Sequence, residues 1–181
     1  MDYIIEQGGI TMKFGVAMFP SKELQDKVNQ YRKRYDAHYA LIPPHITIKD
    51  RFEADESEKE EIAKYLKEVA KKHEPTEIEI KKVSSFSPNS LVIYFKVEKN
   101  EKLQSLHDAL NSGDFYGENK HPFVPHLTIA QGQTTQEYED IFGHLSMIGI
   151  QHKETLDKIS LLYQLENGVW QVYETYRLGE G

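Results

Sequence analysis

A short segment that contains histidine and threonine occurs twice in this chain, as PHITI at residues 44–48 and as PHLTI at residues 125–129. Side chains of a strand alternate between its two faces, so each copy places its histidine and threonine on one face and its aliphatic residues on the other. Two imidazoles with pKa values near neutrality can act as acid and base in the cleavage of a phosphodiester. The repeat therefore predicts His45 and His126 as an acid–base pair.

Two threonines and one lysine extend this predicted site. Thr47 and Thr128 lie on the same strand faces as the histidines, and their hydroxyls can bind non-bridging phosphate oxygens without adding a fixed charge. Lys49 has the same parity as Thr47 and could supply a local cation, although a solvated strand lysine is an equally good interpretation. A single strand histidine beside threonine is more often structural, so it is the matching second copy that favours catalysis.

Metal and thiolate chemistry fit the sequence less well. The chain has no cysteine, which excludes disulfides, zinc ribbons and a thiolate nucleophile. His38 and His121 precede the two motifs, but there is no His-Glu-x-x-His segment, so metal ligands would have to come from scattered positions. We therefore expect no metal and no other cofactor. A metallohydrolase remains an alternative, and it would lose activity in chelator.

Composition limits the partners of the chain. Its 181 residues, 39% hydrophobic and 28% charged, are typical of a globular protein of one domain or two closely packed lobes. The formal net charge of −7 argues against an extended nucleic-acid surface or an anionic membrane, but a small phosphorylated substrate needs only a few local donors. No apolar run approaches the ~20 residues of a membrane helix. A cysteine-free chain fits the cytoplasm.

Hydrophobic periodicity predicts an α+β protein whose sheets are mostly antiparallel. Asn167 and Gly168 stand between two alternating apolar segments, which indicates a terminal β-hairpin. Ser21 and either Thr134 or Thr135 are in positions to cap helices. The expected strands cover residues 14–19, 45–52, 78–86, 91–97, 127–130, 156–165 and 169–178, and the expected helices cover residues 21–35, 57–72, 102–110 and 135–145.

The first eleven residues differ from the rest. They show no clear period, and Met12 is followed at once by a strand pattern. Read back into codons, residues 7–12 correspond to a purine-rich ribosome-binding site, a spacer and a start codon. We therefore expect residues 1–11 to be an upstream extension or non-native leader, and residues 12–181 to form a single two-lobed domain. Mass spectrometry of protein made from the native gene would decide this.

The paired His-x-Thr-x motifs resemble those of the 2H phosphoesterase superfamily, and the segment from Met12 to Pro20 resembles its YjcG-like bacterial branch. The resemblance spans Met12 to about Leu178. It implies two pseudo-symmetric lobes, with antiparallel sheets and flanking helices around a central cleft. One lobe would combine the N-terminal segment with the C-terminal hairpin, and the other would use the middle of the chain.

The same resemblance implies roles for the motif residues. His45 would be the proton donor to the leaving oxygen and His126 the proton acceptor from water, with Thr47 and Thr128 binding phosphate. The implied activity is metal-independent hydrolysis of a phosphodiester or 2′,3′-cyclic phosphate of a nucleotide, an RNA end or a related small molecule. Two alternatives stay open: a non-catalytic module that binds phosphate or an RNA end, and an RNA 2′-5′ ligase.

Overall fold

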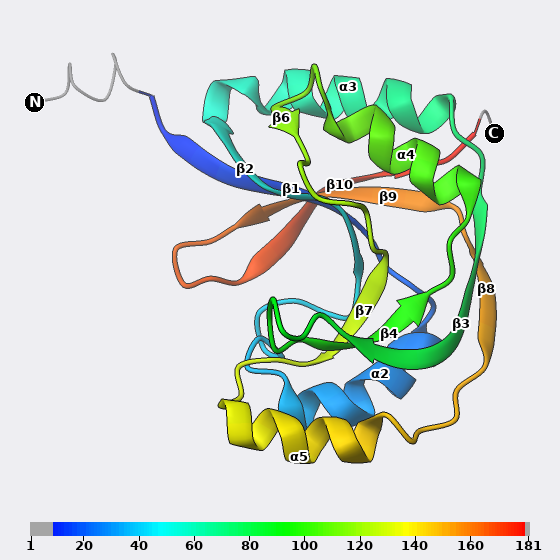
Figure 1. Ribbon diagram of the computed structural model, residues 1–181. Coiled ribbons are helices and arrows are strands. Elements are labelled where there is room, and N and C mark those ends of the chain that lie inside the picture. Colours follow the sequence, from blue (N-terminus) through cyan, green and yellow to red (C-terminus); the bar gives the residue numbers. More distant parts are fainter. Residues whose placement is uncertain (1–8, 180–181) are drawn as a thin grey trace, which may run out of the picture.

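Two four-stranded antiparallel sheets form the centre of the molecule in the computed structural model, which describes residues 9–179 (Figure 1). The first sheet has the strand order β10-β9-β1-β2 and the second has the order β7-β4-β3-β8. Their strands are β1 (Thr11–Met18), β2 (Ile46–Asp55), β3 (Thr76–Ser85), β4 (Ile93–Val97), β7 (His126–Ala130), β8 (His152–Leu156), β9 (Lys158–Gln164) and β10 (Trp170–Arg177). The predicted lobes are confirmed: N-terminal strands join the C-terminal hairpin, and the middle of the chain forms the other sheet.

Helices cover the sheets on two sides of the molecule, with α3 and α4 on one side and α2 and α5 on the other (Figure 1). Ser21 caps the first of them by accepting a hydrogen bond from the Leu24 amide (3.2 Å), and Thr134 forms a reciprocal capping box with Glu137. Both predicted cap positions are thus confirmed. The helices are α2 (Lys22–Tyr35), α3 (Lys59–Lys71), α4 (Glu101–Asn111) and α5 (Thr135–Leu145), with a 3₁₀ turn at Glu56–Glu58. No helix within residues 9–179 is long and apolar enough to cross a membrane.

The order of elements repeats, because β1-α2-β2-α3 is followed later by β4-α4-β7-α5. Each helix that precedes a motif strand packs on the other motif strand: α2 contacts β7, and α4 contacts β2. The two motif strands β2 and β7 are edge strands of their sheets and contact each other. The halves are therefore interlocked, and both copies of the repeat lie where the two sheets meet.

Burial of alternate side chains explains why these segments form strands at this junction. Ile46 and Ile48 of β2 and Leu127 and Ile129 of β7 are at most 1% exposed, so the aliphatic face of each motif belongs to the core. Burying such a side chain stabilises the fold by about 1.5–3 kcal/mol. Because the aliphatic residues are held in the core, the histidine and threonine of each copy must face away from it.

Two parts of the chain differ from the sequence prediction. The strand expected at residues 156–165 is β9, whereas the separate strand β8, which belongs to the second sheet, is not predicted by the sequence. The small two-stranded ladder between β5 (Ser112–Gly113) and β6 (Gly117–Glu118) is not predicted either. The turn at residues 167–168 is confirmed, with Gly168 at a φ of +90°. The predicted leader lies mostly outside the described residues, although β1 already begins at Thr11, so its origin stays a prediction.

Candidate active site

The two motif histidines have matching surroundings. His45 immediately precedes β2 and His126 is the first residue of β7. The Nδ1 atom of His45 lies 2.8 Å from the carbonyl oxygen of Pro43, and that of His126 lies 2.7 Å from the carbonyl oxygen of Val124. Since a carbonyl can only accept, each Nδ1 carries the proton and each Nε2 is left as the basic nitrogen. Within residues 9–179 no hydrogen bond engages either Nε2, so both are available to a substrate.

A hollow lies on each side of Thr47, and together the two hollows carry all four motif side chains. The smaller hollow, of about 260 Å³, is lined by His45, Thr47 and Thr128. The larger hollow, of about 600 Å³, is lined by His126 and Thr47, and Asp50 lines both. The larger volume is in the range of small-molecule sites. Thr47 is thus shared by the hollow that His45 lines and the hollow that His126 lines.

Burial favours the neutral form of both imidazoles. It lowers the pKa of His45 to about 4, and the positive charge of Arg32 and the charged form of His126 act in the same direction. Opposing these, the hydrogen bond to Pro43 and the carboxylate of Asp36 raise that pKa. Burial also lowers the pKa of His126, against the hydrogen bond to Val124 and the carboxylate of Asp50. At neutral pH without substrate, both histidines are therefore neutral.

Lys49 lies in a distorted part of β2. Its Nζ donates hydrogen bonds to the carbonyl oxygens of Leu110 (2.9 Å) and Gly117 (3.1 Å), and its side chain is buried under α4 and the β5–β6 turn. Two β-bulges between Thr47 and Phe52 each add a residue to β2 and interrupt the alternation of side chains. Lys49 also lines the smaller hollow with His45 and Thr47, so its role as a phosphate ligand stays a prediction.

Several residues that sequence reasoning did not single out also line the hollows. The smaller hollow is lined by Arg32 of α2 and by Asp36, which directly follows α2. It is also lined by Gln131, which directly follows β7, and by Trp170 of the hairpin. An arginine and an aspartate four residues apart on a helix usually form an exposed pair, so only the fold shows that this one is buried. Trp170 is the single tryptophan of the chain, which is the one feature of the sequence that could have drawn attention to it.

Two loop segments, at residues 86–90 and 119–124, border the larger hollow. Phe86 and Phe123 give it aromatic walls, and Asn89 and Asn119 give it amide groups. Phe123 stacks on His107 with ring centroids 4.1 Å apart, and Phe86 packs edge-on against the ring of His126. Flat aromatic surfaces beside amides are suited to a nucleobase. Tyr173 and Tyr176 of the terminal hairpin line neither hollow.

The histidines outside the repeat do not gather into a metal site. His38 lines the smaller hollow and His121 the larger one. Within the part of the chain that the structure describes, there is no group of three or more His, Cys, Asp or Glu residues that could hold a metal ion.

Comparison with known proteins adds relatives and structural neighbours. The model of the 2′-5′ RNA ligase superfamily matches residues 20–168. Two proteins that bear the name "Putative phosphoesterase", from Geobacillus sp. (strain WCH70) and Bacillus cereus (strain B4264), are 51% and 49% identical to this chain. The alignments cover 93% and 94% of this chain and 97% and 99% of those proteins.

Two solved structures share the fold at low sequence identity. Escherichia coli LigT complexed with 3′-AMP has a TM-score of 0.68 at 13% identity, and the match covers 94% of this chain and 100% of LigT. The protein TT0787 of Thermus thermophilus has a TM-score of 0.68 at 19% identity, with 94% of this chain and 100% of that chain covered. LigT structures have also been determined with ATP and with NADP⁺. At these identities the similarity shows the fold alone.

Proposed function

The chain belongs to the 2′-5′ RNA ligase superfamily of two-histidine (2H) phosphoesterases, and from this we propose that it hydrolyses a phosphodiester or a 2′,3′-cyclic phosphate by metal-independent acid–base catalysis. The observation that carries the proposal is the pair of equivalent imidazoles. Each is fixed through Nδ1 to the carbonyl two residues earlier, and each leaves Nε2 free beside the shared Thr47. This arrangement supplies one acid and one base to a single phosphate.

In the proposed reaction the phosphate binds between the hydroxyls of Thr47 and Thr128. His126 takes a proton from water at Nε2, the water oxygen bonds to phosphorus, and the bond from phosphorus to the leaving oxygen breaks. His45, which must enter the reaction as the imidazolium with a proton on both ring nitrogens, gives its Nε2 proton to that leaving oxygen, so His45 ends neutral and His126 ends charged. The bound phosphate anion favours the charged form of a neighbouring imidazole and so offsets part of the effect of burial.

This direction of proton transfer follows the family resemblance, whereas two charges near the histidines favour the reverse. Asp50 favours a protonated His126, and Arg32 disfavours a protonated His45. The two assignments predict different effects of the leaving group on the activity of the two histidine variants.

The proposed substrate is a nucleotide, an RNA end or a related small phosphorylated molecule. The larger hollow, with Phe86 and Phe123, can hold a base next to His126. LigT, which shares the fold, has been crystallised with 3′-AMP, ATP and NADP⁺. The net charge of −7 does not suit a long nucleic-acid surface.

Turnover in chelator is the primary test of the proposed function. We expect the purified protein, in EDTA, to open 2′,3′-cyclic nucleotides or oligonucleotides that end in a 2′,3′-cyclic phosphate, and chromatography of the product shows which bond breaks. Activity that disappears in EDTA and returns with a divalent metal would instead support the metallohydrolase alternative. Tight binding of these compounds without turnover would support the binding module.

The pH dependence of kcat/KM should have an optimum below pH 6.5. Acid–base catalysis needs one imidazole charged and one neutral, and kcat/KM reports the free enzyme. Because the pKa of His45 is lowered to about 4 and that of His126 is also lowered, the singly protonated pair is most abundant below the ordinary value of 6.5. Activity should fall as pH rises and the remaining proton is lost, and also below about pH 4, where both rings become charged.

A 2′,3′-cyclic nucleotide is the suitable substrate for this profile, since its phosphodiester has a single acidic proton and carries one negative charge throughout this pH range. Circular dichroism at each pH would separate loss of the fold from loss of the reacting form. An optimum at or above about pH 7.5 would contradict the prediction, because it would require at least one histidine with a raised pKa.

A further inference from the structure

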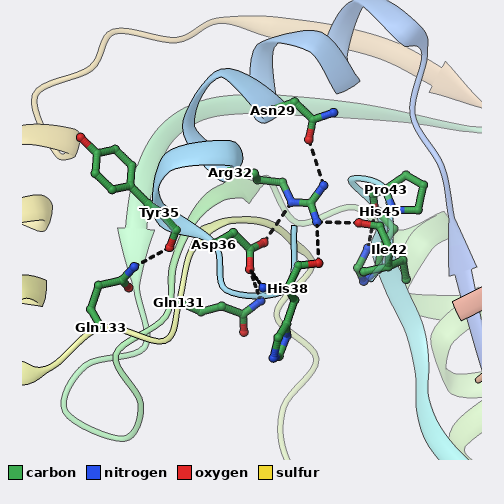
Figure 2. A network of polar contacts seen from close by, with 10 residues as sticks. All are labelled: Asn29, Arg32, Tyr35, Asp36, His38, Ile42, Pro43, His45, Gln131 and Gln133. Atoms are coloured by element: carbon green, nitrogen blue, oxygen red, sulfur yellow. Dashed lines mark hydrogen bonds and ion pairs between the residues drawn. The ribbon is translucent and has the colours of Figure 1, made fainter. Parts of the chain in front are cut away.

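Between α2 and the two motif strands lies a buried ion pair that the proposed reaction does not use. The Nε atom of Arg32 lies 2.9 Å from Oδ2 of Asp36, and the two side chains are 3% and 2% exposed (Figure 2). Taking two charges out of water is costly, and such a pair is often no more stabilising than apolar residues of the same size. Fold stability alone is therefore a weak explanation for its presence here.

The arginine holds the segment that leads into the first motif. Its Nη2 donates to the carbonyl oxygens of Ile42 (2.6 Å) and His38 (3.5 Å), and its Nη1 donates to Oδ1 of Asn29 (2.9 Å). The carbonyl of the next residue after Ile42, Pro43, accepts the hydrogen bond from Nδ1 of His45 (Figure 2). Arg32 thus fixes the peptide adjacent to the one that orients the imidazole.

The aspartate reaches the second motif from the same pair. Its Oδ1 accepts hydrogen bonds from the amide of His38 (2.8 Å) and from Nε2 of Gln131 (2.9 Å). Gln131 directly follows β7, three residues after Thr128, and its backbone forms a parallel bridge with Asp36. The three side chains therefore connect the segment before His45 to the end of the strand that carries His126.

We propose that Arg32, Asp36 and Gln131 form a positioning unit, which holds the two histidine segments together and sets the electrostatic environment of His45. The proposal rests on the proposed function, in which His45 is a catalytic group. The proposal gives none of the three residues a contact with the substrate. Nearly all N–H donors of Arg32 and both carboxylate oxygens of Asp36 already form hydrogen bonds within the protein. They act through His45.

The charges of the pair affect His45 in opposite directions. Arg32 lowers the pKa of His45 and Asp36 raises it, while the charged form of His126 also lowers it. The remaining ionisable groups that line the same hollow are His38, Lys49, Asp50 and Arg51. Removing one partner should therefore move the titration of His45 in a direction that depends on which partner is removed.

The test measures the titration of His45 by NMR of its imidazole in the complete protein, with the signal assigned by its absence in His45→Gln. Arg32→Gln should raise the pKa of His45, and Asp36→Asn should lower it until the ring stays neutral over the accessible acidic range. A loss of structure would move the pKa of His45 in the same direction in both variants, towards the pKa of an exposed histidine near 6.5. Equal or same-direction shifts in the two variants would overturn the electrostatic part of the proposal.

Two variants without a change of charge test the positioning part. Arg32→Lys keeps the charge but cannot make the same fork of hydrogen bonds, and Gln131→Met removes the donor to Asp36. In both we expect kcat to fall by about tenfold to about a hundredfold, with KM and the His45 titration little changed. Unchanged kcat in both would overturn the proposal. If neither Arg32→Gln nor Asp36→Asn folds, Arg32→Lys and Gln131→Met still test the proposal.

Matched controls lie on the same helix. Lys22 and Asp26 form an exposed pair with the same spacing, 2.8 Å apart, so Lys22→Gln and Asp26→Asn should change neither kcat nor the titration. The imidazole ¹⁵N shifts of His45 report its Nδ1–H tautomer without any substrate, and Arg32→Lys should weaken that preference. These readouts separate failure of this proposal from failure of the proposed function: if the wild type turns over no substrate, the titrations still give an answer.

Discussion

Replacing either His45 or His126 by alanine is expected to lower kcat by at least ~10² and up to ~10⁴, the usual contribution of one positioned acid or base. In the proposed reaction each of the two imidazoles offers its own Nε2 to the phosphate, so neither can replace the other. Steady-state rates on a 2′,3′-cyclic nucleotide in EDTA measure the effect. The double variant should be little worse than either single variant, because the two groups act on one reaction.

The matched control is His144→Ala, since His144 is an exposed histidine of α5 outside both hollows. It should retain wild-type kcat. Loss of less than about tenfold in either motif variant, with the fold intact by circular dichroism, would remove that histidine from the acid–base pair. The remaining histidine and water would then have to account for the chemistry.

The same variants distinguish the two directions of proton transfer. A nitrophenyl phosphodiester of a nucleoside releases nitrophenolate, which needs no proton to leave. The variant that lacks the general acid should therefore lose much less activity on this substrate than on a dinucleotide with an alcohol leaving group. The family resemblance predicts that this variant is His45→Ala, whereas the charges of Asp50 and Arg32 favour His126→Ala.

The repeat contained enough information to predict where the motif strands lie, because the fully buried Ile46, Ile48, Leu127 and Ile129 alternate with His and Thr. A period of two with aliphatic residues on one face leaves no other orientation. The equivalence of the two lobes was predicted from the family resemblance, and the structure confirms it in the strand orders of the two sheets. Local signals also predicted the helix caps at Ser21 and Thr134.

What could not be predicted depends on contacts between distant segments. Nothing local marks His152–Leu156 as a strand, because Leu156 is its one apolar residue and the segment is a strand through its pairing with β3 of the second sheet. The hydrogen bond between Asp36 and Gln131 joins residues 95 positions apart. Burial of Arg32 follows from the packing of α2 on β7 of the other half, which is a consequence of the interlocked topology.

Lys49 shows how one local irregularity changes the interpretation of a site. The parity argument assumes a regular strand, and the two bulges of β2 violate it just after Thr47. With its ammonium bound to the carbonyls of Leu110 and Gly117, Lys49 instead connects β2 to the end of α4 and to the β5–β6 turn. Its expected role is to hold the segment that contributes Asn119 and His121 to the larger hollow.

Replacing Lys49 by methionine is therefore expected to destabilise the protein by about 2–4 kcal/mol while leaving kcat within about tenfold of the wild type. The change removes two hydrogen bonds from a charged donor and leaves two carbonyl oxygens without it, each worth about 1–3 kcal/mol. The Lys49 side chain is itself buried, so methionine keeps most of its volume and apolar contacts. Urea unfolding gives the change in the free energy of unfolding, with the slope m as a check that the same surface is exposed.

Lys13→Met is the matched control, because Lys13 is an exposed lysine of the neighbouring strand β1. Its free energy of unfolding should change by no more than about 0.5 kcal/mol, as is usual for a surface position. The opposite pattern, with Lys49→Met as stable as the wild type but at least ~10² slower, would mean that the ammonium leaves Leu110 and Gly117 to contact the phosphate when substrate binds. The larger hollow would then be reshaped during the reaction, because the turn that Lys49 holds is part of its wall.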